Sequence, residues 1–337
     1  MRSRGVFRIA AVLAAGVLVL GACSSDDSEG SSGGSGSSSD GVKVGIALSA
    51  ASNDKGFSQA HYDGLVAACE TIDCEVSVSE NADDPQKQID ALKNLAADND
   101  LVIGVGAEFA AAGTAVAPQF PDTQFSIING ETSDAENLHV YVINQGYAAY
   151  VAGAVAGTVS SADTVGYLGG LDIPPTAGSD AGFELGAQSI TPGIKYLSAM
   201  VGDFTDSAKA KELASQQIAE GADVIYAYLD TATAGVVEAI TESGKDVKLI
   251  TQAVAECTHP GIVIGGTTLS TNAYMAAMVT DFIDDTLPEE PKVFALEDPE
   301  IQKMELCSDQ PAELQTLVDS VTAGLNDGTT KLPESVI

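Results

Sequence analysis

The stretch VKVGIALSAASNDKGFSQAHYDGL, residues 42–65, decides the fold. Its first part, residues 42–48, is an apolar run with the length and composition of a buried strand. Asp54 and Gly56 then supply residue types of a turn, and a helical pattern begins at Phe57. A buried strand, a turn and a helix in this order predict the first half of a βαβ unit. A turn does not require Phe57, which raises the question of whether this loop also contacts a ligand.

The same alternation of strands and helices continues along the chain. In a first series we expect strands at 42–48, 75–81, 101–106, 124–130 and 138–144, with helices at 57–72, 85–98 and 110–120. In a second series we expect strands at 164–171, 194–202, 222–229, 247–253 and 261–269, with helices at 146–160, 179–190, 206–220 and 234–243. A helix at 271–286, a strand near 292–296 and a helix at 312–326 complete the chain. Continuous apolar strands separated by helices indicate parallel sheets covered on both faces.

Two consecutive series of this kind predict an α/β fold with two doubly wound parallel-sheet lobes joined by a hinge. We assign residues 42–145 and about 262–290 to an N-terminal lobe, and residues 146–261 and about 291–337 to a C-terminal lobe. Ligands of open parallel sheets bind beyond the carboxyl ends of the strands. Two such ends facing each other would form a cleft that the hinge can close.

The N-terminus has the composition of an export signal. Three arginines precede the apolar segment 9–20, which is too short and wrongly flanked for a stable membrane span. We therefore expect residues 1–22 to be a secretory signal. The sequence LGAC that ends at Cys23 resembles the bacterial lipobox, which implies a lipid anchor on this cysteine. A conventional signal with an incidental cysteine is the alternative.

The residues after Cys23 differ from the rest of the chain. Residues 24–40 contain only Ser, Gly, Asp and Glu, which cannot bury apolar surface. We expect residues 23–41 to form the lipidated cysteine and a disordered tether. The protein would then be exported and anchored to the outer face of the cell membrane through Cys23.

The charge of the chain excludes one class of partner. The 337 residues include 48 acidic and 15 basic side chains, a formal net charge of −33. This charge is spread over the chain and would repel phosphate backbones, so we do not expect nucleic-acid binding. The charge alone identifies no ligand.

Four cysteines remain after Cys23, in agreement with an oxidising location. Cys69 and Cys74 are close in sequence and could form a local bridge, which would leave Cys257 and Cys307 to pair. Four cysteines allow three connectivities, and the sequence does not choose between them. A zinc site is the less favoured alternative, because no CxxC motif or histidine cluster accompanies these residues.

Four segments carry a resemblance to a known family. They are NDKGFSQAHYDGL, PDTQFSIING, DIPPTAGSDAGFELGAQ and GDFTDSAKAKELASQQIAEGADVIYAYLDTATAGVVEAI. In this order and spacing, over residues 42–282, they resemble the basic membrane protein family of solute-binding lipoproteins. The resemblance implies a type I periplasmic-binding fold that delivers purine nucleosides or related solutes to the permease of an ABC importer.

In this family the loop after the first strand lines the ligand cleft. The resemblance therefore implies that Phe57 offers a flat apolar face to a heterocycle or sugar ring. A core position on the helix is the alternative for Phe57. Asp54 is expected to cap the helix and could also accept a hydrogen bond from the ligand. Ser58 stands where the family commonly has Asn and keeps a hydrogen-bonding group of shorter reach.

Other strand ends supply further candidates by resemblance. Asn129 occupies a position where the family often has Asp, a contact to a base edge. Tyr226 and Tyr228 share one strand face, where the family places an aromatic residue on the opposite wall, although core packing explains at least one of them. Glu108 and Asp172 lie in further loops at strand ends.

This chain also departs from the family pattern. Members that hold a ribose usually carry Asp after the strand written KLITQAVAE here, where this chain has Ala253 and Ala255, with Gln252 and Glu256 as the nearby polar residues. The family lysine beyond the next strand falls near Ser270. Two charge-assisted hydrogen bonds to ribose hydroxyls would be lost. We expect a small neutral solute that is not necessarily a standard nucleoside.

An enzyme on this fold is not expected. His61, His139 and His259 are far apart in sequence, and neither GxSxG nor HExxH occurs. We expect no catalytic residue, no metal and no cofactor. A lipid-anchored sensor without transport, or a sugar-specific binding protein on the same fold, remains the alternative to a solute receptor of an importer.

Overall fold

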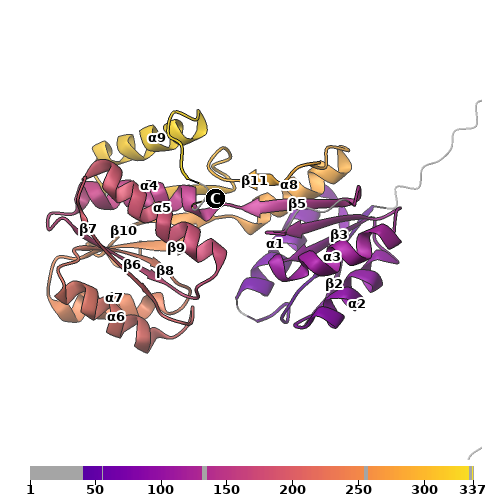
Figure 1. Ribbon diagram of the computed structural model, residues 1–337, viewed down its shortest axis with the longest axis horizontal. Coiled ribbons are helices and arrows are strands. Elements are labelled where there is room, and N and C mark those ends of the chain that lie inside the picture. Colours follow the sequence, from indigo (N-terminus) through magenta and orange to yellow (C-terminus); the bar gives the residue numbers. More distant parts are fainter. Residues whose placement is uncertain (1–40, 55, 131–134, 254–256, 334–335, 337) are drawn as a thin grey trace, which may run out of the picture. The chain divides into compact units, whose positions relative to one another are not determined.

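The computed structural model describes residues 41–54, 56–130, 135–253, 257–333 and 336. These residues form two lobes, each built on its own six-stranded sheet with helices on both faces (Figure 1). The prediction of an α/β fold with two doubly wound lobes is confirmed. The expected signal, Cys23, the tether and Glu256 lie outside the described residues.

The first lobe is an all-parallel sheet in the order β11-β5-β4-β3-β1-β2. Its strands are β1 (Val42–Ala47), β2 (Cys74–Ser79), β3 (Leu101–Val105), β4 (Gln124–Ile128), β5 (Leu138–Ile143) and β11 (Lys292–Phe294). Helices α1 (Phe57–Ile72) and α8 (Thr271–Ile283) pack on one face, and α2 (Pro85–Ala96) and α3 (Ala110–Val116) on the other. Because both faces are covered, β3 is buried at every position, as its continuous apolar sequence predicts.

The second lobe has the sheet order β12-β10-β9-β8-β6-β7, with only β12 antiparallel to its neighbour. Its strands are β6 (Thr164–Gly169), β7 (Lys195–Met200), β8 (Val224–Tyr228), β9 (Lys248–Ala253), β10 (Val263–Leu269) and β12 (Gln302–Leu306). Helices α4 (Gln145–Val159), α5 (Pro174–Ile190) and α9 (Ala312–Asn326) cover one face, and α6 (Ser207–Ala219) and α7 (Thr233–Ser243) the other.

Small residues let α4 and α5 pack with their backbones in contact. A Cβ atom at Gly153 would lie 2.1 Å from the carbonyl oxygen of Phe183, and one at Gly186 would lie 2.0 Å from that of Tyr150. No side chain fits at such distances. The close approach explains why the segment of α4 is rich in Gly and Ala.

Within the described residues the chain passes between the two sheets at three crossovers. The first is Asn144, between β5 and α4, whose N–H donates to the carbonyl oxygen of Phe294 at 3.0 Å. The second is Ser270, between β10 and α8, whose N–H donates to the carbonyl oxygen of Ile301 at 2.8 Å. The third connects β11 to β12, and Gln302 Nε2 at its end donates to the carbonyl oxygen of Asn144 at 2.8 Å. Hydrogen bonds thus join all three crossovers.

Two predicted lobe boundaries differ from the structure. Residues from 262 were expected in the N-terminal lobe, but β10 pairs with β9 and β12 in the second sheet. Residues from 291 were expected in the C-terminal lobe, but β11 pairs with β5 in the first sheet. The chain therefore crosses one strand later in both cases. An apolar strand pattern indicates burial and does not specify which sheet the strand joins.

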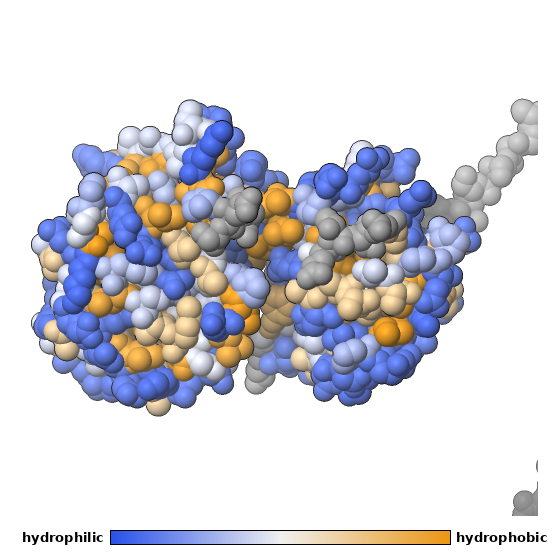
Figure 2. All heavy atoms as spheres, in the orientation of Figure 1, coloured by the Kyte–Doolittle hydropathy of each residue, from blue (hydrophilic) through white to orange (hydrophobic). Residues whose placement is uncertain are grey.

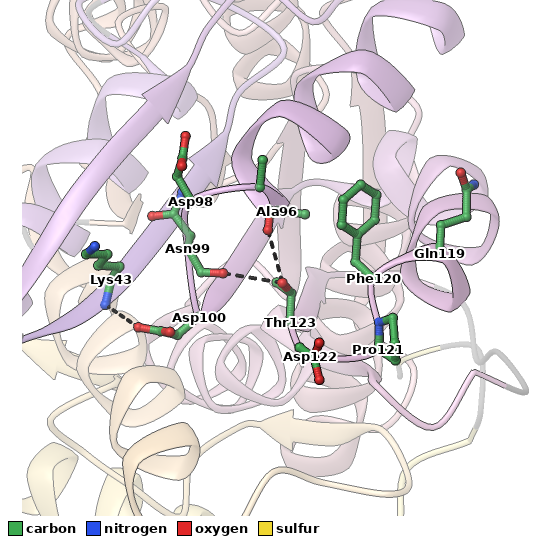
Figure 3. Close-up of a pocket in the computed structure, with 11 residues that line it drawn as sticks. Lys43, Ala96, Asp98, Asn99, Asp100, Gln119, Phe120, Pro121, Asp122 and Thr123 are labelled. Atoms are coloured by element: carbon green, nitrogen blue, oxygen red, sulfur yellow. Dashed lines mark hydrogen bonds between the residues drawn. The ribbon is translucent and has the colours of Figure 1, made fainter.

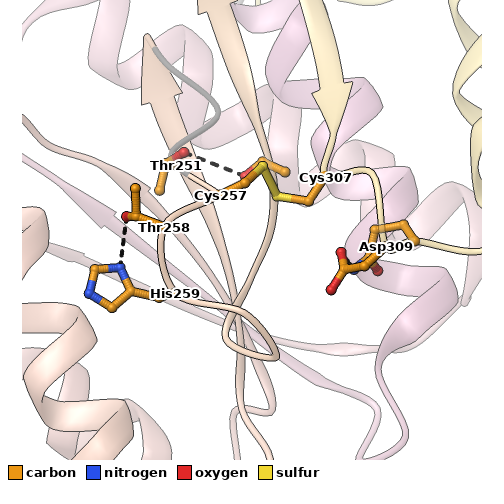
Figure 4. The surroundings of a disulfide bond; sticks show 8 residues. Thr251, Cys257, Thr258, His259, Cys307 and Asp309 are labelled. Carbon is orange, nitrogen blue, oxygen red and sulfur yellow. Dashed lines mark hydrogen bonds between the residues drawn. A yellow bond between two sulfur atoms is a disulfide. The ribbon is translucent and has the colours of Figure 1, made fainter.

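Two disulfides are present. Cys69–Cys74 joins the end of α1 to the start of β2, with a Cα–Cα distance of 4.7 Å. Cys257–Cys307 ties the turn that follows β9 to the residue after β12, with a Cα–Cα distance of 5.7 Å (Figure 4). Of the three connectivities left open by the sequence, this is the one with the local bridge.

Figure 2 shows hydrophilic residues over much of the visible face of each lobe, with apolar residues scattered among them. None of the helices in the described ranges is both long enough and apolar enough to cross a membrane.

Candidate ligand-binding site

The residues predicted to contact a ligand lie at the carboxyl ends of parallel strands, except Tyr226, which is in the middle of β8. Asp54, Phe57 and Ser58 follow β1, Glu108 follows β3, Asn129 follows β4, Asp172 follows β6, Tyr228 ends β8, and Gln252 is in the last part of β9. These edges are where ligands of doubly wound sheets bind. Their exposure and hydrogen bonds differ, however, and separate residues that can reach a ligand from those that cannot.

Asp54 caps α1 from within the preceding turn. Its Oδ1 accepts hydrogen bonds from the N–H groups of Gly56 at 2.8 Å and Gln59 at 3.0 Å. Partial burial acts to raise the pKa of Asp54, but the hydrogen bonds from Gln59, Gly56 and Ser58 outweigh it and leave this pKa below its ordinary value. Asp54 therefore stays ionised and its carboxylate fixes the loop, as the sequence predicts for a cap.

Ser58 is turned away from solvent. It is 2% exposed, and its Oγ accepts a hydrogen bond from the N–H of Ala50 at 3.3 Å. Ser58 thus ties the start of the loop to the first turn of α1. In this structure its side chain offers a ligand no exposed atom, in contrast to the prediction.

Phe57 projects from the first turn of α1. Its side chain is 53% exposed, so it is not part of the core, and the alternative of a core position is wrong. Its ring rests against the imidazole of His61, with ring centroids 4.1 Å apart. An exposed aromatic ring in the first turn of the helix that follows β1 can stack on a planar ligand.

His61 lies beneath Phe57 in the interior of the lobe. It is 4% exposed, and its Nδ1 is 2.7 Å from the carbonyl oxygen of Phe57. A carbonyl oxygen only accepts, so Nδ1 carries the proton. Burial lowers the pKa of His61 to about 4, against smaller opposing effects of the Phe57 carbonyl and Asp54. His61 is therefore neutral at pH 7.

This buried histidine should make stability depend on pH. Since the pKa of His61 is lower in the folded state, its contribution is fully present above about pH 6.5 and is lost as the pH falls toward 4. From His61 alone we expect the free energy of unfolding to be about 2 kcal/mol lower at pH 5 than at pH 7. Urea unfolding of the parent and of His61→Gln at both pH values measures this difference. The variant should lose less stability than the parent on acidification, and an equal loss would contradict the assignment.

The side-chain amide of Asn129 forms a hydrogen bond with the backbone through its oxygen. Asn129 adopts a left-handed conformation with φ 56°, which Asn tolerates better than most residues. Its Oδ1 accepts a hydrogen bond from the N–H of Ile143 at 2.9 Å. The amide orientation follows from this bond, so a contact to a ligand would be made by Nδ2 as a donor. Where an Asp would accept, Asn129 would donate.

The two tyrosines of β8 belong to the core of the second lobe. Tyr226 is fully buried, and its hydroxyl is 2.9 Å from Thr267 Oγ1. Burial raises the pKa of Tyr226 to about 12 and raises that of Tyr228, which is 5% exposed. Both side chains point to the face that α4 and α5 cover. The expectation that Tyr228 flanks an open site is not met, because helices bury that face of the sheet up to the strand end.

The aromatic residue that does reach the surface at this strand end is Phe204, in the loop between β7 and α6. Its half-buried ring lies over the backbone of Gly170, where a Cβ atom would lie 2.1 Å from Phe204 Cδ1. Its centroid is 6.4 Å from that of Tyr228. Phe204 was not among the predicted residues. The signal that could have found it is the one that singled out Phe57, an aromatic residue in the segment between a strand and the next helix or at the start of that helix.

The remaining candidates differ in how accessible they are. Glu108 and Asp172 are exposed, and Asp172 stands between the exposed apolar residues Leu171 and Ile173. Gln252 is half-buried, with its Nε2 3.3 Å from Oε1 of Gln145 at the start of α4.

Ser270, near which the resemblance places the family lysine, has a structural role. Ser270 Oγ accepts a hydrogen bond from the N–H of Ala273 at 3.2 Å and so caps α8. Its hydroxyl oxygen is engaged in the helix cap and does not replace an ammonium group.

A pocket of about 630 Å³ lies at the opposite edge of the first sheet (Figure 3). It is lined by residues at the amino ends of the strands, including Lys43 at the start of β1 and Asp98, Asp100 and Asp122 in the loops before β3 and β4. Here the Asp100 carboxylate accepts a hydrogen bond from the N–H of Lys43 at 2.9 Å. Because ligands of this fold bind at the carboxyl ends of the strands, we do not take this pocket as the functional site. Across the described part of the chain, no group of three or more His, Cys, Asp or Glu side chains could hold a metal ion.

Comparison with known families agrees with this geometry. The family model Bmp, described as ABC transporter substrate-binding protein PnrA-like, matches residues 41–294. The chain belongs to the Bmp family. This confirms the resemblance found in the sequence, and Bmp proteins are substrate-binding proteins of ABC transporters, not enzymes.

Individual Bmp relatives are distant. The CD4+ T-cell-stimulating antigen of Listeria innocua is 27% identical over 220 residues, which cover 64% of this chain and 61% of the relative. The ABC transporter nucleoside-binding protein BmpA of Lactococcus lactis is 26% identical over 226 residues, which cover 66% of this chain and 64% of the relative. The chain thus spans less than two thirds of the length of these relatives.

Solved structures support the same fold. An ABC transporter solute-binding protein from Conexibacter woesei superposes with a TM-score of 0.69 at 24% identity, covering 88% of this chain and 99% of that one. At this identity the similarity concerns the fold alone.

Proposed function

We propose that this Bmp protein is an extracytoplasmic, lipid-anchored receptor that binds a small neutral solute and delivers it to the permease of an ABC importer. The observation that carries the proposal is the pair of accessible aromatic rings, Phe57 and Phe204, at strand ends of separate lobes. A planar ring bound between them would be covered on both faces when the lobes close. The name of the nucleoside-binding relative supports a nucleoside or a related purine or sugar compound as the solute class.

The polar groups near these rings favour an uncharged solute. Glu108 and Asp172 are exposed carboxylates at the strand ends, and they would repel a phosphate or carboxylate group. Asn129 Nδ2 is available as a donor and suits a carbonyl oxygen or a ring nitrogen. An uncharged heterocycle with such acceptors satisfies both conditions.

A thermal-shift panel tests this function. Nucleosides, free bases, sugars and amino acids are each added in excess, and the melting temperature is recorded. A ligand that binds only the folded state at about 100 times its Kd stabilises by about 2.7 kcal/mol. We expect a rise with guanosine, inosine, adenosine or a free base. If none of these shifts the melting temperature while a sugar raises it, the nucleoside class is wrong.

The lipid anchor has its own test. With Cys23→Ala the acceptor of the diacylglycerol is gone, and we expect the protein to move from the membrane fraction to the soluble exported fraction. Cell fractionation with an antibody against the folded lobes measures this distribution. Cys69→Ala, which removes a cysteine of a disulfide instead, serves as the control and should stay with the membrane. Retention of the Cys23→Ala protein in the membrane fraction would contradict the anchor.

A further inference from the structure

The exposed ring of Phe57 is the first of a row of rings that runs through the first lobe. The ring centroids of Phe57 and His61 are 4.1 Å apart, and those of His61 and Tyr274 are 5.7 Å apart. Tyr274 lies 6.2 Å from Phe294. These four residues, here called the aromatic row, come from α1, α8 and β11. The row therefore connects α1 to α8 and β11, which are far from α1 in sequence.

Only the first ring of the aromatic row is exposed. His61, Tyr274 and Phe294 are all buried in the core between the sheet and the helices α1 and α8. Side chains in such a core are close-packed, so a displaced ring must be accommodated by its neighbours. Close-packed rings thus connect Phe57 at the exposed end of the row to Phe294 at its buried end.

The buried end of the aromatic row is anchored. Tyr141 stacks on Phe294 with centroids 5.6 Å apart, and its hydroxyl donates to Asp281 at 3.0 Å. The same carboxylate binds Lys292 Nζ at 2.6 Å, and this ammonium lies 5.6 Å from the centroid of the Phe294 ring. Phe294 is therefore in contact with Tyr274 of the row and also with Tyr141 and Lys292, which Asp281 holds in place.

The buried end of the row also meets the crossovers. The carbonyl oxygen of Phe294 accepts the N–H of Asn144 at 3.0 Å, and Asn144 is the first crossover. The carbonyl oxygen of Asn144 in turn accepts Gln302 Nε2 at the end of the third crossover. Tyr274 sits in the first turn of α8, directly after the second crossover at Ser270. Unbroken contacts therefore lead from Phe57 to all three connections between the lobes.

We propose that the aromatic row links the position of Phe57 to the first crossover, with His61 and Tyr274 as positioning residues. This inference rests on the proposed function in one respect, that Phe57 contacts the solute. A solute that orders Phe57 then also orders the Phe294–Asn144 hydrogen bond, and breaking the row loosens both ends together. The row acts through contiguous packing, which is a physical route for coupling between a binding residue and a hinge.

The test breaks the row in the middle and observes both ends without any solute. The chain contains no tryptophan, so Phe57→Trp introduces a single fluorescent reporter at the exposed end. In this background Tyr274→Leu removes the third ring. Tyr274→Phe is the matched control because it keeps the ring, and the Tyr274 hydroxyl is buried with no hydrogen-bond partner among the described residues. Two readouts are used, the anisotropy decay of the introduced tryptophan and hydrogen exchange of the Asn144 amide.

With Tyr274→Leu we expect a larger fast component in the anisotropy decay and exchange at Asn144 that is about tenfold faster. Tyr274→Phe should leave both at the values of the parent. Exchange of the Val201 amide, which donates to Gly169 in the second lobe, shows how much is due to global unfolding. If Tyr274→Leu and Tyr274→Phe give the same anisotropy decay at position 57, or the same exchange rate at Asn144, the link is overturned.

A second variant keeps the proposal testable if Tyr274→Leu does not fold. In the otherwise native chain, His61→Leu removes the ring between Phe57 and Tyr274, and exchange of the distant Asn144 amide is measured. The link is supported if His61→Leu accelerates exchange of the Asn144 amide, relative to the parent, more than it accelerates exchange of the Val201 amide. Exchange of the Asn144 amide at the parent rate, or an equal acceleration at both amides, overturns the link. Because no solute is present, the outcome does not depend on which ligand the thermal-shift panel identifies.

Discussion

Removing the Cys257–Cys307 disulfide should lower the free energy of unfolding by about 4 kcal/mol, and removing Cys69–Cys74 by only about 2 kcal/mol. The difference follows from loop length. The two bridges close loops with sequence separations of 50 and 5 residues, and a longer loop loses more conformational entropy in the unfolded chain when it is closed.

The substitutions should match the burial of each cysteine. Cys257 is exposed and is replaced by Ser, whereas Cys307 is buried and is replaced by Ala so that no hydroxyl is buried without a partner. By the same reasoning Cys69→Ala with Cys74→Ser forms the comparison. Urea unfolding under oxidising conditions gives both values. If the two double variants lose equal stability, loop closure does not explain the contribution of the longer bridge.

The hydrophobic pattern of the sequence contained enough information for the two-lobed fold. The inner parallel strands β3, β6 and β8 are buried at every position and read as largely apolar runs, for example LVIGV in β3. The pattern did not contain the strand order. The stretch of β10 is apolar whichever sheet it joins, and only its pairing with β9 and β12 shows that the chain crosses at Ser270 and not at 262.

The sequence predicted which loops form the candidate site, but it predicted less well which side chains in those loops are exposed. Asp54 acts as the expected cap because its short carboxylate accepts hydrogen bonds from N–H groups of the first turn. Ser58 was placed at the ligand by analogy, although it shares the buried stripe of α1 with His61 and Leu65 at helical spacing. That spacing, used alone, would have predicted its burial.

The second lobe shows a different reason for error. The spacing of Tyr226 and Tyr228 correctly placed both on one strand face, but it could not reveal that α4 and α5 cover this face up to the strand end. Phe204 reaches the strand end because the loop after β7 folds back over Gly170. Gly170 permits this close approach because it has no side chain, and such a contact between distant segments depends on tertiary structure.

Removing both accessible rings should weaken solute binding about a thousandfold, because each stacked ring contributes about 1–3 kcal/mol. Phe57→Ala and Phe204→Ala are each expected to raise Kd by about tenfold to a hundredfold. The two residues lie in separate lobes, so their effects should add in the double variant. Isothermal titration calorimetry, with the solute that raises the melting temperature, gives the Kd of the parent, of each single variant and of the double variant.

A third phenylalanine separates stacking from a general loss of apolar surface. Phe120 is half-buried like Phe204, but it lines the pocket at the amino ends of the strands in the first lobe. Phe120→Ala should therefore leave Kd unchanged while lowering stability. Phe204→Ala also uncovers the ring of Tyr228, which can then contact the solute, so its effect should be smaller than that of Phe57→Ala. An unchanged Kd for Phe57→Ala together with a large effect of Phe120→Ala would move the site to the other edge of the sheet.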